Sequence, residues 1–302
     1  MDFNQLESFL QVVKHKSFSA AARELYLTQP TISNNIQNLE NELNTILLDR
    51  KSKNITLTDS GKALYKYAVE IINIRDQAIY DIVKQSNSIE GHMEINASSI
   101  PKQYVLPYII KDFIKKYPRI LFSIIHKNSK DIVDDIIKGK LNFGIVGAKY
   151  PSKTLEYIDF YEDQLILAVP NNNDYLKYND EPLDIEILFS ENFIFREKGS
   201  GTRSFIEKAL LENNVSLEDL NIRSFADSNE MIKKMIELEL GISFISKLSI
   251  KNEIELGLIK PLKIKNLNLT RKFYFVYSNN RTQSPIVEAF KEFLDNWSGI
   301  RE

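Results

Sequence analysis

The stretch from Ser17 to Leu43 constrains the fold most, because it reads as two short amphipathic helices joined by a tight turn. The first helix carries four apolar residues at helical spacing on one face: Phe18, Ala21, Ala22 and Leu25. Thr28 then stands at an N-cap position, where its hydroxyl can accept a backbone N–H. Pro30 follows in the first turn of the second helix, where proline is tolerated.

The second helix separates an apolar stripe from a polar face. The stripe consists of Ile32, Ile36, Leu39 and Leu43. The polar face consists of Gln29, Thr31, Ser33, Asn34 and Gln37. Short hydrogen-bonding side chains near a helix N-terminus suit a reader of the DNA major groove, so we predict a helix-turn-helix. Any amphipathic helical hairpin would show the same stripe, so the pattern alone leaves that alternative open.

Elements on either side complete a small domain. Phe3, Leu6, Leu10 and Val13 predict a first helix that packs across the hairpin. Residues 47–58 predict a wing that ends in a strand. Three basic residues fall in this wing, where they would lie along the phosphate backbone: Arg50, Lys51 and Lys53. The alternative for them is a solvated loop.

A long helix is predicted from about Ser60 to Ser86. Its heptad seam is interrupted by one charged residue and consists of Leu64, Ala68, Ile71, Arg75, Ala78 and Ile82. A helix of this length needs a partner, so we predict that it dimerises the protein. The alternative is a helix that lies on its own domain, but that domain is too small to cover it.

Composition excludes several classes of site. The 302 residues include no cysteine and three histidines, which excludes disulfides and thiolate chemistry and argues against a zinc site. No cofactor or metal is expected. No apolar run is long enough to cross a bilayer, and the first residues show no leader pattern, so we expect a cytoplasmic protein without a membrane partner.

The rest of the chain alternates strands and helices after a polar boundary near Asn87. Strands are predicted over residues 93–98, 120–126, 143–146, 165–169, 193–195, 222–225, 241–245 and 271–277. Helices are predicted over residues 102–117, 130–139, 201–213, 228–238 and 285–297. Two α/β units without a catalytic motif predict a two-lobed binding domain.

Three strand-to-helix junctions carry small hydroxyl residues. They are residues 97–101, residues 128–129 and residues 196–203, and the last includes two glycines and two arginines. Such junctions meet ligands at the carboxyl ends of strands, so together they predict a cradle for a small anion such as a carboxylate, sulfate or phosphate. Taken singly, each serine or threonine is as readily an ordinary helix cap. The glycine spacing matches neither a P-loop nor a dinucleotide fingerprint.

The N-terminal residues FNQLESFLQVVKHKSFSAAARELYLTQPTISNNIQNLENELNTILLDR, followed by ITLTDSGKALY, closely resemble the signature of the LysR-type transcriptional regulators. The resemblance implies an α/β protein with an N-terminal all-α winged helix-turn-helix, a long linker helix and a C-terminal two-lobed, periplasmic-binding-protein-like effector domain. It implies domains at residues 1–60, 61–88 and 89–302, with lobe I at about 89–165 and 268–302 and lobe II at about 166–267.

The resemblance also implies partners and site residues. The expected DNA-contacting set is Phe18, Ser19, Thr28, Gln29, Pro30, Thr31, Ser33, Asn34, Gln37, Arg50, Lys51 and Lys53. The expected effector-binding set is Ser98, Ser99, Ile100, Ser129, Arg196, Gly201, Thr202 and Arg203. Expected partners are double-stranded DNA, a small anionic effector and further copies of the chain in a homodimer and a homotetramer, with RNA polymerase as a further candidate.

Two departures from the family pattern affect specificity. Family members often carry a basic residue after the recognition-helix serine, whereas Ser33 is followed here by Asn34-Asn35. The effector domain most resembles members linked to sulfur assimilation, selenium metabolism or carbon fixation, yet Ile100 replaces a threonine that some sulfur-pathway members carry. Two rival classes, an α/β enzyme and a solute-binding protein acting on a small anion, lack support because no Ser/His/acid set and no leader pattern are apparent.

Overall fold

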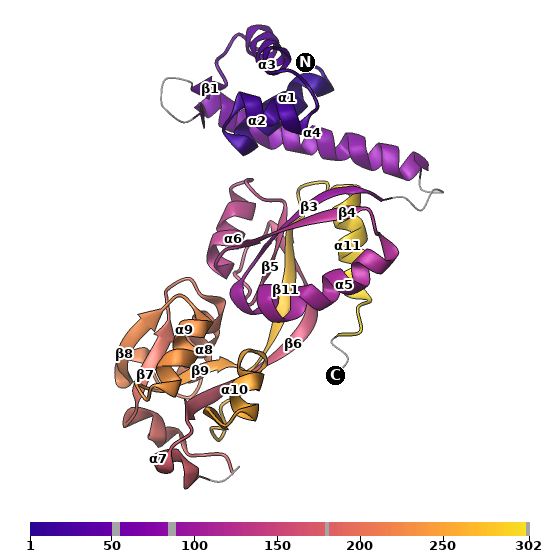
Figure 1. The fold of residues 1–302 in the computed structure, drawn as a ribbon. Coiled ribbons are helices and arrows are strands. Elements are labelled where there is room, and N and C mark those ends of the chain that lie inside the picture. Colours follow the sequence, from indigo (N-terminus) through magenta and orange to yellow (C-terminus); the bar gives the residue numbers. More distant parts are fainter. Residues whose placement is uncertain (50–54, 84–88, 179–180, 300–302) are drawn as a thin grey trace. The chain divides into compact units, whose positions relative to one another are not determined.

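The computed structural model describes residues 1–49, 55–83, 89–178 and 181–299 (Figure 1). The chain forms two compact units. One takes in Met1–Asn87 and Asn280–Glu288, and the other takes in Ser88–Asn279 and Ala289–Glu302. Across the described residues, no helix combines the length and the apolar character that crossing a membrane requires.

Three capped helices build the core of the first unit. They are α1 (Phe3–His15), α2 (Phe18–Glu24) and α3 (Gln29–Glu42). Asp2 and Gln5 form a capping box, and the hydroxyls of Ser17 and Thr28 accept backbone N–H groups of α2 and α3. Phe9, Ile32 and Ile36 are fully buried between them. The predicted helix-turn-helix is therefore confirmed, with Thr28 as the cap of its second helix.

The apolar stripe of α3 ends one turn earlier than predicted. Leu43 lies just past α3 as its C-cap, and 39% of its surface is exposed, so the buried stripe ends at Leu39. The wing is a two-stranded antiparallel sheet of β1 (Leu48–Asp49) and β2 (Thr56–Leu57). Its three basic residues, Arg50, Lys51 and Lys53, lie outside the described residues.

The long helix α4 (Asp59–Val83) divides its seam between two environments. Leu64, Ala68 and Ile71 pack into the core of the first unit, so the alternative of a helix lying on its own domain holds for this part. Arg75 lies under Phe3, 5.1 Å from the ring centroid, and its guanidinium bonds to Glu7. The last two seam residues, Ala78 and Ile82, are exposed, and so are Ile74 and Ile79, which lie outside the seam.

A mixed sheet organises the second unit. In its described part, seven strands pair in the order β10-β6-β11-β5-β3-β4, and β9 also pairs with β6. Lobe I contains β3 (Gly91–Ala97), β4 (Ile120–His126), β5 (Phe143–Val146) and most of β11 (Thr270–Ser278). Helix α6 (Ser129–Ile137) lies on one side of these strands, and α5 (Leu106–Lys116) and α11 (Pro285–Asp295) lie on the other (Figure 1).

The strand β6 (Leu155–Pro170) is three times longer than its predicted core of 165–169, because its first half pairs with β11 in lobe I. Its last residues pair with β9 (Ser243–Ser246) and β10 (Ile259–Leu262) in lobe II. One strand thus runs through both lobes (Figure 1). Charged residues at positions 156, 159, 162 and 163 break the apolar pattern of its first half and concealed it, and β10 was not predicted.

Lobe II is completed by a parallel pair, β7 (Asn192–Arg196) and β8 (Asn221–Ala226). Its helices are α7 (Asn173–Leu176), α8 (Gly201–Leu211), α9 (Asn229–Glu237) and α10 (Lys251–Glu255). Helix ends elsewhere differ from the predicted ones by a residue or two. One difference is larger in kind: the predicted helix 102–117 begins as a π-helical turn at Pro101–Val105 before α5 continues it.

Phe113 is expected to be a dominant core residue of lobe I. It is fully buried and packs edge-on against Phe122, Phe290 and Phe293 at 5.1–6.1 Å between ring centroids. Phe113→Ala should lower the free energy of unfolding of this unit by about 3–5 kcal/mol, because truncation leaves a cavity. The free energy of unfolding is measured by urea titration with the fluorescence of Trp297 as the signal, since this tryptophan is the only one in the chain.

Phe189→Ala is the matched control, because that side chain is 44% exposed and should lose less than about 1.5 kcal/mol. Equal losses from the two variants would contradict the assignment of Phe113 to the core.

Candidate functional site

One small cavity in the second unit gathers all three predicted strand-to-helix junctions. Its lining consists of Ser98, Ser99, Ile100, Pro101, Asn128, Ser129, Gly147, Arg196, Ser200, Gly201, Thr202, Arg271 and Phe273. Lobe I supplies the first seven of these residues, lobe II supplies Arg196 and the start of α8, and β11 supplies the last two. Its volume of about 10 Å³ holds one water-sized group.

Two buried polar atoms at this cavity are unpaired. Within the described part of the chain, neither the Ser98 hydroxyl nor Nη2 of Arg271 has a hydrogen-bond partner. Ser98 is 7% exposed and Arg271 is 5% exposed. An unsatisfied buried polar group costs about 1–3 kcal/mol, so such a pair indicates a place where a ligand supplies the missing bonds.

Arg271 is held by lobe I and lobe II together. Its Nε donates to Asp163 at 2.8 Å, and its Nη1 donates to the Thr202 hydroxyl at 2.9 Å. The Ser246 hydroxyl donates to the second oxygen of Asp163 at 2.6 Å. Burial lowers the pKa of Arg271, and the Asp163 carboxylate opposes that shift. The guanidinium keeps its charge at neutral pH, because the ordinary pKa of an arginine side chain lies far above 7.

Arg271 was missed in the sequence because it lies inside a strand pattern, where a charged residue reads as solvent-facing. A signal did exist: Arg271 pairs with Asp163 in the register of β11 and β6. Opposite charges at paired strand positions predict a contact once the pairing is known. The pairing itself joins residues more than a hundred positions apart, and the sequence does not reveal it.

Close packing of lobe II on lobe I explains the glycine that begins α8. A Cβ at Gly201 would lie 2.7 Å from the Ser129 hydroxyl and 3.2 Å from the carbonyl carbon of Gly147. The Ser129 hydroxyl is fully buried and accepts the backbone N–H of Gly147 at 3.2 Å. Ser129 and Gly201 therefore line the cavity as predicted, with Ser129 already bonded to protein.

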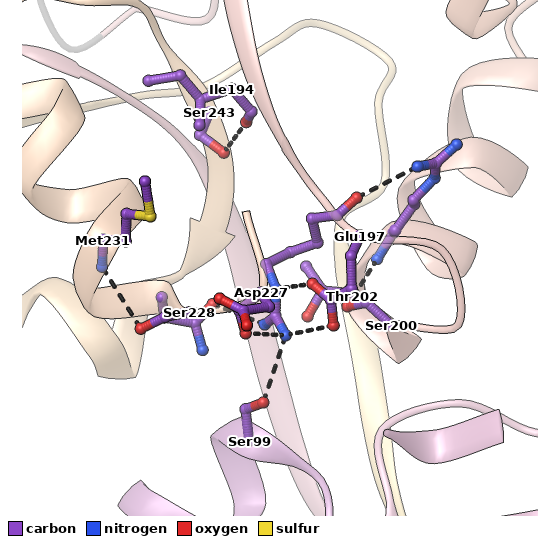
Figure 2. Close-up of polar contacts among 12 residues, drawn as sticks. Ser99, Ile194, Glu197, Ser200, Thr202, Asp227, Ser228, Met231 and Ser243 are labelled. Atoms are coloured by element: carbon purple, nitrogen blue, oxygen red, sulfur yellow. Dashed lines mark hydrogen bonds and ion pairs between the residues drawn. The ribbon is translucent and has the colours of Figure 1, made fainter. Parts of the chain in front are cut away.

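The two predicted arginines differ in their placement. Arg196 lines the cavity, is bound by the neighbouring Glu197 carboxylate and donates across the lobes to the Ser99 hydroxyl at 3.4 Å. In Figure 2, Ser99 reaches from its own helix toward the lobe II residues Glu197 and Asp227. The Asp227 carbonyl and the Asn229 side chain accept the remaining Arg196 donors.

The expectation that Arg203 faces the cavity is corrected by the structure. Its guanidinium bonds to Glu207 at 2.8 Å, one turn along α8, and stacks 4.7 Å from the ring centroid of Phe225. Arginine on an aromatic face satisfies the cation locally, so Arg203 is drawn away from the cleft. Its backbone N–H goes to the Ser200 hydroxyl, which makes Ser200 an N-cap.

A second contact joins the lobes beside the cavity. Tyr104 and Gln103 of lobe I both donate to Glu230 of α9, at 3.1 Å and 3.4 Å. Lys233, nearly buried, ion-pairs with Glu230 and Glu253 at 2.8 and 2.9 Å. Burial raises the pKa of Tyr104 to about 12, so its hydroxyl stays a donor at neutral pH.

His126 completes the polar surroundings of Ser99. Its Nε2 is hydrogen-bonded to the Ser99 hydroxyl at 2.9 Å. Burial, with the nearby charges of Lys102 and Arg196, lowers the pKa of His126. The imidazole is therefore neutral at pH 7, and the positive charge at the cavity comes from the arginines.

The polar face of α3 is free for contact with a partner. Thr28, Gln29, Pro30, Asn34 and Gln37 are exposed, Thr31 and Ser33 are half-buried, and Ser19 of α2 is exposed. Phe18 is half-buried and packs against the core of the first unit. Asn35 turns inward and donates to the buried Ser8 hydroxyl at 2.9 Å, so only Asn34 of the Asn34-Asn35 pair faces outward.

Known proteins resemble this chain over more than nine-tenths of its length. A probable RuBisCO transcriptional regulator from Gracilaria tenuistipitata var. liui is 30% identical over 295 residues, covering 96% of this chain and 95% of its own. The HTH-type transcriptional regulator CysL from Bacillus subtilis is 29% identical over 278 residues, covering 92% of this chain and 91% of its own.

Two solved structures share the fold. Full-length OxyR from Pseudomonas aeruginosa has a TM-score of 0.80 at 16% identity, covering 100% of this chain and 98% of that one. The regulatory domain of Synechocystis CcmR in complex with 2-PG has a TM-score of 0.61 at 26% identity, covering 68% of this chain and 97% of that one.

Two family descriptions match consecutive parts of the sequence. Residues 3–62 match the bacterial regulatory helix-turn-helix protein of the lysR family, and residues 86–298 match the LysR substrate binding domain. The helix-turn-helix, the two-lobed α/β unit and these matches agree. The chain belongs to the LysR family of DNA-binding transcriptional regulators, which carry an effector-binding domain and are not enzymes.

Proposed function

We propose that this regulator responds to a small anion bound in the cavity lined by Ser98 and Arg271. The observation that carries the proposal is the pair of unpaired, buried polar atoms, the Ser98 hydroxyl and Arg271 Nη2, on one cavity. A carboxylate, sulfate or phosphate oxygen accepts from both donors. The predicted residues Ser99, Ile100, Ser129, Arg196, Gly201 and Thr202 line the same cavity.

Cavity size indicates how binding acts on the protein. A space of about 10 Å³ admits one water-sized group, whereas a whole anion with its carbon skeleton is larger. Binding therefore requires the residues around the cavity to part, and these residues belong to both lobes. A ligand shifts an equilibrium only when it binds one arrangement better than another, and this requirement to open the lobes supplies that difference.

The chemical class of the effector finds support in a relative. The Synechocystis CcmR domain, 26% identical to this chain, is in complex with 2-PG. In this chain Arg196 and Arg271 line the cavity between the lobes, which favours a negatively charged ligand here. Among small anions, sulfate is the least favoured, because Ile100 of the cavity replaces the threonine that some sulfur-pathway members carry.

DNA recognition is assigned to the exposed face of α3. Gln29, Thr31, Ser33, Asn34 and Gln37 would contact base edges, while Ser19, Thr28 and Pro30 lie near the helix start, where phosphate contacts form. Phe18 packs in the core and would support α2, and Arg50, Lys51 and Lys53 of the wing would add phosphate contacts.

The exposed isoleucines of α4 support self-association. Ile74, Ile79 and Ile82 are 52%, 54% and 83% exposed, which is unusual for a helix face that stays in contact with solvent. A second copy would cover them, giving a homodimer with two recognition helices, and pairs of dimers would give a homotetramer. We place the protein in the cytoplasm, with domains at 1–60, 61–88 and 89–302 and with RNA polymerase as a further partner.

Ser98→Ala tests the effector cavity. The Ser98 hydroxyl has no partner among the described residues, so the unliganded protein should keep its melting temperature within a degree or so. Sulfate, thiosulfate, phosphate, O-acetylserine and small carboxylates are screened on the full chain by thermal shift. The anion that binds should add about 2.7 kcal/mol at roughly 100 times its Kd.

Ser98→Ala should raise the Kd of that anion at least tenfold, which lowers the stabilisation by about 1.4 kcal/mol. Ser190→Ala, at an exposed position, should leave the stabilisation unchanged. An undiminished shift in Ser98→Ala, or no shift with any anion, argues against the cavity as the effector site.

The double substitution Gln29→Ala/Asn34→Ala tests the recognition face. The wild-type chain first selects a duplex from a random library. The variant's preference for this duplex over a scrambled one should be weaker by roughly tenfold or more, because each amide contact to adenine discriminates by about 1–3 kcal/mol. Fluorescence anisotropy at fixed salt measures both affinities. Asn41→Ala, an exposed amide on the last turn of α3, is the control, and equal behaviour of the two variants would show that α3 does not read the sequence.

A further inference from the structure

A second and larger cavity, which we call the hinge cavity, lies where α8 of lobe II faces β11 and the residues after β5 of lobe I. Its volume of about 490 Å³ falls in the range typical of small-molecule sites, about 300–1,000 Å³. Helix α8 contributes one wall, the residues after β5 contribute a second, and β11 contributes a third. Arg271 and Gly147 line both this cavity and the small one, so the two spaces are neighbours that share these residues.

Positive charge dominates the wall of this cavity. Lys149, Lys208, Arg271 and Lys272 line it, against the single carboxylate of Glu212. Asp163 and Asp159 already pair with Arg271 and Lys272, so the positive charge left to attract an anion comes from Lys149 and Lys208. Aromatic surface is present as well, from Phe205 and Tyr274, which would pack against a carbon skeleton.

Two of the lysines are available for a ligand. The Lys149 ammonium lies 4.7 Å from the centroid of Tyr274 and 5.7 Å from that of Tyr157, and within the described chain no carboxylate lies at ion-pair distance from it. Lys208 reaches Glu212 at 3.8 Å with both side chains exposed, a pair worth at most a few tenths of a kcal/mol. Lys272 is already paired with Asp159.

We propose that this hinge cavity is a second effector site, which takes an organic anion with at least two negative groups, such as a tricarboxylate or a bisphosphate. One negative group would meet Lys149 and another would meet Lys208, with the carbon skeleton against Tyr274 and Phe205. The small cavity suits a single negative group at Ser98. The two sites therefore select anions by size and charge, and they use different residues apart from Arg271 and Gly147.

Position gives the second site a regulatory consequence. Lys208 and Phe205 belong to α8 of lobe II, whereas in lobe I Lys149 follows β5 and Tyr274 lies in β11. An anion that bridges Lys149 and Lys208 favours the lobe arrangement in which both ammonium groups reach the same ligand. Its binding and the opening of the small cavity then act on the same hinge, which makes their effects on affinity reciprocal.

Isothermal titration of the full chain with citrate and with fructose 1,6-bisphosphate, at constant ionic strength, tests the proposal. At least one probe should bind with a Kd of roughly millimolar or tighter. Lys149→Gln/Lys208→Gln should weaken that binding at least tenfold. Lys111→Gln/Lys138→Gln removes the same charge from exposed positions of lobe I and should change it less than twofold.

Ser98→Ala separates this proposal from the small cavity, because that hydroxyl does not line the hinge cavity. The Kd of the bound probe should stay within about twofold in Ser98→Ala. Failure of both probes to bind the wild-type chain would overturn the second site. Binding that survives Lys149→Gln/Lys208→Gln, or that is lost in Ser98→Ala alone, would overturn it too, since the probe would then occupy another place.

Discussion

The buried ion pair between Arg271 and Asp163 is the interaction on which the two-lobed unit depends. Asp163 lies in β6, the strand that runs from lobe I into lobe II, and Arg271 lies opposite in β11. Their side chains are 0% and 3% exposed, and Ser246 of lobe II completes the bonding of the carboxylate. Removing one partner of such a pair costs about 3–5 kcal/mol, because the other charge remains buried.

The same guanidinium connects structure with binding. Two of its nitrogens are committed to Asp163 and Thr202, and the third has no partner among the described residues, while Arg271 as a whole lines both cavities. An arginine fixed by two bonds presents its remaining nitrogen in a set direction without losing further side-chain entropy. The hinge thus holds a positive charge at the one place where both lobes and both cavities meet.

The hydroxyls around the small cavity show how a row of serines and threonines divides into structural and free groups. Ser200 caps α8, Ser129 accepts from Gly147, and Thr202 accepts from Arg271. Ser98 alone among these four has no partner within the described residues. The sequence made all of them equivalent candidates, because a cap and a ligand contact use the same residue types at the same helix starts.

The sequence by itself determined the local elements. The capped helix-turn-helix, the wing, the long helix and the alternating strands follow from periodicity and cap residues, which act over a few positions. Resemblance to one family extended this to the two-lobed domain, and the three hydroxyl-bearing junctions were predicted to share one cleft. Tertiary structure decided what depends on distant pairing: the length of β6, the inward arginine at 271 and the outward one at 203. A strand's partner and a cation's nearest carboxylate or aromatic ring are set by residues far apart in the chain, and no local pattern carries that information.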